Sequence, residues 1–195
     1  MELKRSENAL PWKTIGMKIS DYVREMNAAF ERKLFISALS LSMIIPDICA
    51  TALDEKSFTS RDKYKSWLDR YLIPITAIDS CFSISSSDIY QIRNSVLHNG
   101  SLATNPGKQT RYHNIRFHVF SPSDSLIISD GYFGVGDDQE SEEGKEFHLT
   151  INLATYVKCM TDAVAEFLEQ HPECDKPIDK GRIGYSGIVD FSNSN

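Results

Sequence analysis

Residues 33–53 read KLFISALSLSMIIPDICATAL and form the most apolar stretch of the chain. Apolar residues fall on nearly every side of the helix that this stretch predicts, which is typical of a central helix packed on several faces. We expect Pro46 to kink or restart that helix, because proline lacks the N–H group that a helix interior needs. Asp47 would then lie at the break. The most hydrophobic run, Leu34–Ile45, is interrupted by serines and is too short to span a bilayer.

Helical periodicity continues on both sides of this stretch. Apolar residues at helical spacing predict helices over about 17–31, 61–73 and 152–170. Ser60 is the expected cap of the helix after it, and Pro74 its stop. A further short helix follows the serine-rich loop at 84–87, with Ser86 or Ser87 as its cap. We interpret the apolar stripe of the helix at 61–73 as core: Tyr64, Trp67, Leu68 and Tyr71.

Before the last helix the period of the pattern changes from helical to two. Alternation over 115–119 and 147–151, with an apolar run at 126–128 between them, predicts two or three short antiparallel strands. We expect the acidic stretch 137–146 to be the loop between the last two strands, and 134–136 to be a hairpin turn. The predicted fold is therefore mainly α, a four- to five-helix bundle with a small antiparallel β insertion before the last helix.

The length of 195 residues suits one domain with a substantial core. We divide the chain into an N-terminal extension, a helical domain that contains the β insertion, and an irregular C-terminal tail. Their boundaries are 1–16, 17–174 with the insertion at about 113–151, and 175–195. The extension lacks an apolar signal region. The four cysteines show no metal-type spacing, so we interpret them as reduced core thiols of a cytoplasmic protein.

The net charge of −6 is unusual for a nucleic-acid-binding protein. Most of it is local, because residues 137–146 contain six acids and one base and contribute −5. The remaining −1 leaves a nearly neutral body, which can carry a local phosphate site. It argues against broad, salt-driven binding to long duplexes.

The sequence RNSVLH at 93–98, followed by Asn99-Gly100, places a cation, an amide and an imidazole at the end of one short helix. Gly100 predicts the stop, since glycine accepts the left-handed conformation that closes a helix. On a helical wheel Arg93 falls within the apolar stripe of this helix, whereas Asn94 and His98 share a polar face. A guanidinium group in an apolar stripe is costly unless a carboxylate or a phosphate satisfies it.

Asp47 is the partner that we expect for Arg93. Both residues occupy otherwise apolar helical segments, and buried charges are usually paired. The pair could be purely architectural.

This organisation resembles the HEPN superfamily, whose members are small helical bundles marked by Arg-x-x-x-x-His near the end of the penultimate core helix. The first x is commonly Asn, so the motif matches Arg93, Asn94 and His98. The β insertion, together with an apolar second helix ending in Pro46-Asp47, is similar to a bacterial and plasmid-borne branch. The resemblance covers residues 17–170.

The resemblance implies a homodimeric endoribonuclease without a metal or another cofactor, in a toxin or phage-defence role. The ribose 2′-hydroxyl would attack the adjacent phosphate and leave a 2′,3′-cyclic phosphate. The residue types suit this chemistry, because His98 can transfer protons near neutral pH and Arg93 can stabilise charge on phosphate oxygens. Asn94 can orient His98 or hold a phosphate oxygen. Arg93 and His98 lie about 140° apart on the wheel, so a second protomer could complete the site.

Two other readings stay open. The chain could be a non-catalytic HEPN-like module that binds nucleotides or a protein partner, which the low basic charge favours. It could also be a helical interaction domain in which Arg93 and His98 are structural. The acidic stretch could engage a basic partner such as a neutralising antitoxin.

Overall fold

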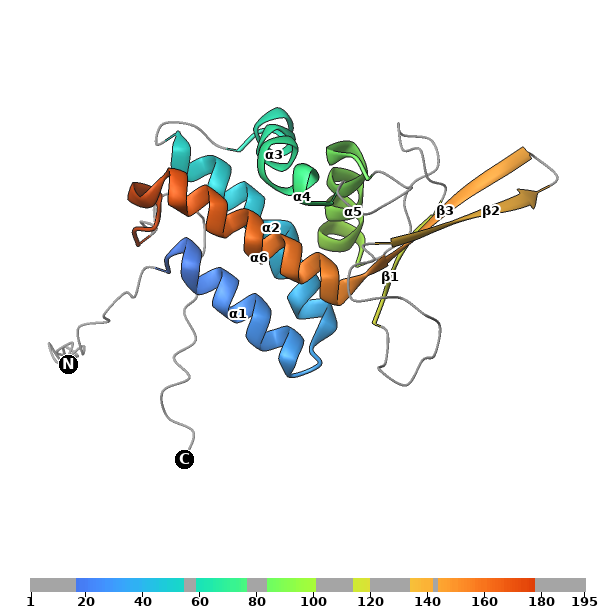
Figure 1. The fold of residues 1–195 in the computed structure, drawn as a ribbon, viewed down its shortest axis with the longest axis horizontal. Helices are drawn as coiled ribbons and strands as arrows, with labels where there is room; N and C mark the ends of the chain where they lie inside the picture. The colour runs from blue at the N-terminus through green and yellow to red at the C-terminus, as the bar shows by residue number, and fades with distance from the viewer. Residues whose placement is uncertain are drawn as a thin grey trace, which may run out of the picture.

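The computed structural model describes residues 17–54, 59–76, 84–100, 114–119, 134–141 and 144–177. The fold is mainly helical and carries one small sheet, as the sequence predicts at this level. Figure 1 shows the helices gathered into one body, with the strands extending from the end near α5 and the start of α6. The helical elements are α1 (Ile19–Glu31), α2 (Phe35–Leu53), α3 (Arg61–Trp67), η1 (Leu68–Leu72), α4 (Ile73–Thr76), α5 (Ser86–Asn99), α6 (Leu153–Gln170) and η2 (Pro172–Cys174).

Helix α2 is the central helix, as its composition predicts, and it contacts α1, α3, α5 and α6. It runs unbroken through Pro46, so the expected restart at that residue is wrong. Pro46 is itself buried, and packing on several sides stabilises the helix although the carbonyl of Ser42 has no N–H partner at position 46.

Because α2 continues past Pro46, the apolar helix is longer than the run Leu34–Ile45 that the sequence analysis judged too short to span a bilayer. At 19 residues and a mean hydropathy of 1.7, α2 is long and apolar enough to cross a membrane. Half of that window is buried inside the fold. Core helices of soluble proteins meet the same criterion, so composition alone is weak support for a membrane span.

The helical segment after Ser60 continues further than the sequence predicts. Ser60 is the N-cap, as expected, and its Oγ accepts a hydrogen bond from the Lys63 N–H at 3.3 Å. Pro74 does not end the segment, which extends through η1, a π-helical turn, and α4 to Thr76. The N–H of Ile73 bonds to the carbonyl of Leu68, and this wider turn relieves the clash that proline makes with the preceding α-helical turn.

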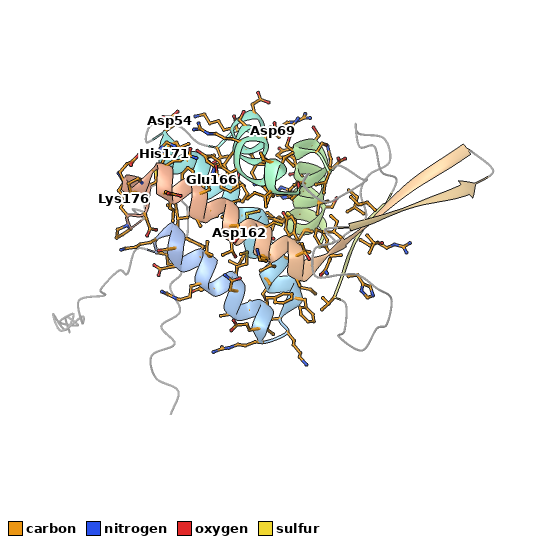
Figure 2. The ribbon with its side chains drawn as sticks, in the orientation of Figure 1. Asp54, Asp69, Asp162, Glu166, His171 and Lys176 are labelled. Carbon is orange, nitrogen blue, oxygen red and sulfur yellow. The ribbon has the colours of Figure 1, made fainter. Side chains whose placement is uncertain are left out.

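The π-helical turn is fixed against α6 by a polar network at the end of that helix. Oε1 of Gln170 accepts hydrogen bonds from Arg70 Nη2 at 3.0 Å and from the Tyr71 hydroxyl at 3.4 Å. Nε2 of Gln170 donates to Glu166, which Figure 2 labels on α6 together with Asp162. Beneath this network the ring of Tyr71 packs edge-on against Phe167 in the core.

Helix α5 is bounded by two residues with clear stereochemical roles. Ser85, one residue before the expected caps, is the N-cap, because Asp88 lies three residues later and completes a capping box with it. The prediction of Ser86 or Ser87 is therefore wrong by one or two positions. Gly100 ends the helix at φ 60°, as predicted, and its N–H bonds to the carbonyl of Ser95.

The sheet has the order β1-β3-β2, with strands β1 (Asn114–His118), β2 (Gly134–Ser141) and β3 (Gly144–Asn152). β2 is antiparallel to β3, but β1 pairs with β3 in parallel, with Ile115 opposite Leu149. The expectation of antiparallel strands throughout is thus wrong. Alternation of apolar residues reports the buried face of a strand and carries no information on its direction.

The acidic stretch lies in strands where it is described. Residues 137–141 belong to β2 and 144–146 to β3, and residues 134–136 begin β2 and form no turn. Both expectations of irregular structure are wrong here, because backbone pairing with β3 outweighs the weak strand propensity of Asp, Glu and Gly. The apolar run at 126–128 lies outside the described residues.

The start of α1 contacts the residues that follow η2, so the two ends of the helical domain lie together. Asp175 accepts hydrogen bonds from the N–H and the hydroxyl of Ser20 at 3.0 and 2.9 Å. Asp175 therefore packs with the domain, although the sequence assigns it to the tail. Cys49, Cys159 and Cys174 are buried, as expected of core thiols, and Cys81 and residues 178–195 lie outside the described part.

The cap of α5 can be tested by substitution. We expect Ser85→Ala to lower the free energy of unfolding by about 1 kcal/mol, because it removes the acceptor for the Asp88 N–H. Ser87→Ala, at a position expected from sequence to cap the helix, is the matched control. Urea unfolding of both variants measures the difference, and an equal loss in the two would contradict the assignment of Ser85.

Candidate functional site

The candidate site is built on an ion pair between α2 and α5. Oδ2 of Asp47 accepts hydrogen bonds from Arg93 Nε at 2.9 Å and from Arg93 Nη2 at 2.6 Å. The two side chains are 20% and 21% exposed, so the pair lies at the edge of the core. The contact expected between Asp47 and Arg93 is therefore present.

Local sequence explains why these two residues meet. Arg93 follows Ile92, which is buried together with Ile89, so packing of α5 turns the arginine toward the body of the protein. Asp47 follows Pro46 on α2, between buried positions. Two charges on apolar helices that face each other are stable only as a hydrogen-bonded pair.

Two tyrosine rings surround the guanidinium group of Arg93. Its Cζ lies 5.5 Å from the centre of the Tyr64 ring and 5.9 Å from that of Tyr90. The two rings contact each other edge to face, with 5.6 Å between their centres. Cation–π attraction of this kind adds to the ion pair and holds the guanidinium group in one place.

Asn94 orients Arg93. Its Oδ1 accepts a hydrogen bond from Arg93 Nη1 at 3.1 Å. Arginine has only donors, so the amide oxygen must face it and the amide nitrogen points elsewhere. Asn94 thus completes a set of three hydrogen bonds to the guanidinium group. Within the described residues no hydrogen bond joins Asn94 to His98, so the expectation that Asn94 orients His98 finds no support there.

The electrostatics of the site are a balance of opposing effects. Burial raises the pKa of Asp47 above its ordinary value, although the hydrogen bond and the charge of Arg93 act in the opposite direction. Burial also raises the pKa of Tyr64 well above its ordinary value. Its hydroxyl therefore stays protonated and donates to the carbonyl of Met43 at 3.2 Å.

His98 lies in the last turn of α5, and its side chain is exposed. It makes no hydrogen bond or ion pair within the part of the chain that the structure describes. Within the described residues no hydrogen bond joins His98 to Arg93, and residues five positions apart lie about 140° apart around the helix, as the wheel predicts. Both groups nevertheless belong to the same two turns and both reach solvent.

The tyrosines are the part of the site that sequence reasoning did not assign. Tyr64 is buried, as expected of a core residue, but its ring also faces Arg93. Tyr90 is three residues before Arg93, a spacing that places two side chains on one face of a helix. That spacing is the signal that could have identified it.

The arrangement can hold an anion or a polar ligand beside Arg93 and Asn94, and it offers a titratable imidazole one turn away. Among the described residues, no three His, Cys, Asp or Glu side chains gather in a way that could hold a metal ion. Comparison with known proteins returned no match: no family model, no curated protein and no solved structure matches this chain.

The ion pair predicts a pH-dependent stability. In the fold the pKa of Asp47 lies above its ordinary value of 3.8, so the contribution of this group is favourable at low pH and is lost as the pH rises through the folded pKa. Arg93→Met removes both effects that lower this pKa. The folded pKa of Asp47 then rises further, so stability continues to fall up to a higher pH. We expect Arg93→Met to lower the free energy of unfolding by about 2 kcal/mol at pH 7 and by less at pH 4.

Chemical unfolding at the two pH values measures this difference. In an Asp47→Asn background the carboxylate is gone, so the Arg93→Met substitution should cost the same at pH 4 and pH 7. A pH dependence that survives in this background would show that another group is responsible.

Proposed function

We propose that the protein is a metal-independent endoribonuclease of the HEPN type. The observation that carries the proposal is the end of α5, where Arg93 is oriented by Asp47 and Asn94 and remains partly exposed, five residues before the exposed His98. The mainly helical fold with a small sheet before its last helix is compatible with the family resemblance.

The proposed reaction needs three functions from this site. Arg93 stabilises the negative charge that develops on the phosphate oxygens during attack by the 2′-hydroxyl. His98 accepts the proton of that hydroxyl or supplies one to the leaving oxygen. Asn94 positions Arg93 and can turn its amide nitrogen toward a phosphate oxygen. The products are a 2′,3′-cyclic phosphate and a free 5′-hydroxyl.

A homodimer is part of the proposal. Within the described residues no hydrogen bond joins Arg93 to His98, so a cleft lined by α5 from two protomers would supply an arginine and a histidine to the same phosphate. We further propose a cytoplasmic toxin or phage-defence role, with a neutralising protein as its partner. These roles rest on the family resemblance alone.

One observation favours a second function. Asp47 compensates the charge of Arg93 with two hydrogen bonds, which lowers the attraction of the site for a phosphate. A compensated arginine also stabilises less of the charge that develops during cleavage, so the site suits a non-catalytic module that binds a nucleotide or a protein partner. If the module binds nucleotides, RNA would bind to the protein without being cleaved.

Cleavage of a mixed RNA pool in the presence of a chelator tests the proposal. We expect the wild-type protein to produce cyclic-phosphate ends and His98→Ala to lower the rate at least about 100-fold, the usual scale of acid–base catalysis. His98 is exposed, so its replacement should leave the fold intact, which circular dichroism can verify.

His118→Ala is the matched control, because His118 is an exposed histidine on β1, outside the candidate site. It should cleave at the wild-type rate. RNA binding without cleavage by the wild-type protein would support the second function, and His98→Ala cleaving as fast as wild type would reject the site.

A further inference from the structure

The turn between α1 and α2 exposes two large apolar side chains. Ile36 is 81% exposed and Leu34 is 54% exposed. Among the residues that the structure describes, the one other exposed large apolar residue is Leu53, at the far end of α2. Single exposed apolar residues are ordinary, but two of them at one turn indicate a contact surface. Figure 1 shows this turn at the lower edge of the helical body.

Two cations lie directly before these apolar residues. Arg32 and Lys33 are exposed, and neither forms an ion pair within the part of the chain that the structure describes. Glu31 precedes them and is also exposed, so two cations and one acid give residues 31–36 a net charge of +1. The turn therefore has the opposite sign to the whole chain, whose net charge is −6.

Lys33 has a backbone conformation that is unusual for its residue type. Its φ of 61° lies in the left-handed region, where glycine is the usual residue after a helix. The N–H of Lys33 bonds to the carbonyl of Phe30 at 2.9 Å, and that of Leu34 bonds to the carbonyl of Ala29 at 2.8 Å. These are the hydrogen bonds of a Schellman turn. Glycine would serve the fold better here, so the charge of the lysine points to a role outside the fold.

Two aromatic rings support the turn from inside. Phe30 and Phe35 are half-buried and pack against the core, and the centres of their rings lie 5.6 Å apart. The exposed residues are therefore attached to a fixed base. Transfer of Leu34 and Ile36 into an apolar environment requires no rearrangement of the helices.

The surface of a lipid bilayer fits this turn better than a protein partner does. A stable protein interface buries about 800 Å² on each partner, which is far more than two side chains at one turn provide. The interfacial region of a bilayer takes up a small apolar tip, and nearby cations add attraction to anionic headgroups. Such a contact needs no segment that spans the membrane.

We propose that the α1–α2 turn docks the protein on the surface of a bilayer that contains anionic lipids. Leu34 and Ile36 enter the boundary between the headgroups and the acyl chains, while Arg32 and Lys33 contact headgroup phosphates. Helix α2 remains packed in the helical body, so the contact is peripheral. This inference is independent of the proposed function, and it places the site on α5 in a protein that is held at a membrane.

Sedimentation of the full chain with sucrose-loaded vesicles tests the docking. We expect binding to vesicles made of phosphatidylcholine and phosphatidylglycerol in equal amounts. Binding to pure phosphatidylcholine should be at least about tenfold weaker, because each cation contributes about fivefold at an anionic surface. Ile36→Gln should weaken binding to the anionic vesicles at least about tenfold, since the apolar contact of that side chain is lost.

Two further variants separate docking from folding. Lys33→Gly removes one charge and suits the left-handed backbone, so it should weaken binding about fivefold without lowering the free energy of unfolding. Leu53→Gln is the matched control for Ile36→Gln, because it removes an exposed apolar side chain from the other end of the same helix. It should bind the vesicles as tightly as the wild-type protein.

Three results would overturn the inference. The first is a wild-type protein that does not sediment with the anionic vesicles, and the second is equal weakening by Ile36→Gln and Leu53→Gln. The third comes from light scattering without vesicles. Oligomers that Ile36→Gln dissociates, in a wild-type protein that binds no vesicles, would assign the turn to a contact between copies of the chain.

Discussion

The hydrogen-bonded pair of Asp47 and Arg93 is the constraint on which the candidate site depends. It joins the central helix α2 to α5 at the edge of the core, where neither charge would be stable alone. The pair fixes the rotation of α5 about its own axis. That rotation in turn decides that Asn94 lies beside Arg93 and that His98 faces solvent one turn later.

The site combines rigidity with limited charge. Two tyrosine rings, one carboxylate and one amide hold the Arg93 guanidinium group, so little side-chain entropy remains to be lost when a ligand binds. The same contacts already use three of the N–H donors of the Arg93 guanidinium group. A function that uses Arg93 for charge stabilisation therefore needs additional cations.

The sequence predicts those features that follow from a single strong local rule. A charged residue on an apolar stripe requires a partner, which is why the contact between Asp47 and Arg93 was predictable from two unrelated segments. Gly100 and Ser60 follow equally simple rules for helix ends. The functional roles of Arg93, Asn94 and His98 stay predictions, because their geometry permits more than one chemistry.

Other features depend on tertiary packing and could not be predicted in this way. A proline such as Pro74 would normally end an α-helix. Here the π-helical turn before it, which is hydrogen-bonded to Gln170 of α6, allows the helical segment to continue. Strand β1 runs parallel to β3, a direction that its alternating residues do not encode. Arg61 and Tyr90 belong to helices far apart in sequence, and their contact appears only when α3 and α5 are packed together.

The contact between Ser20 and Asp175 has an architectural consequence. Because it joins the start of α1 to the residues that follow α6, the two ends of the described helical domain lie side by side. Such a domain can be inserted into a surface loop of a host protein, or circularly permuted through a short linker, without stretching either helix. The hydrogen bonds between Ser20 and Asp175 thus bring together the two points at which a linker or a host chain would be joined.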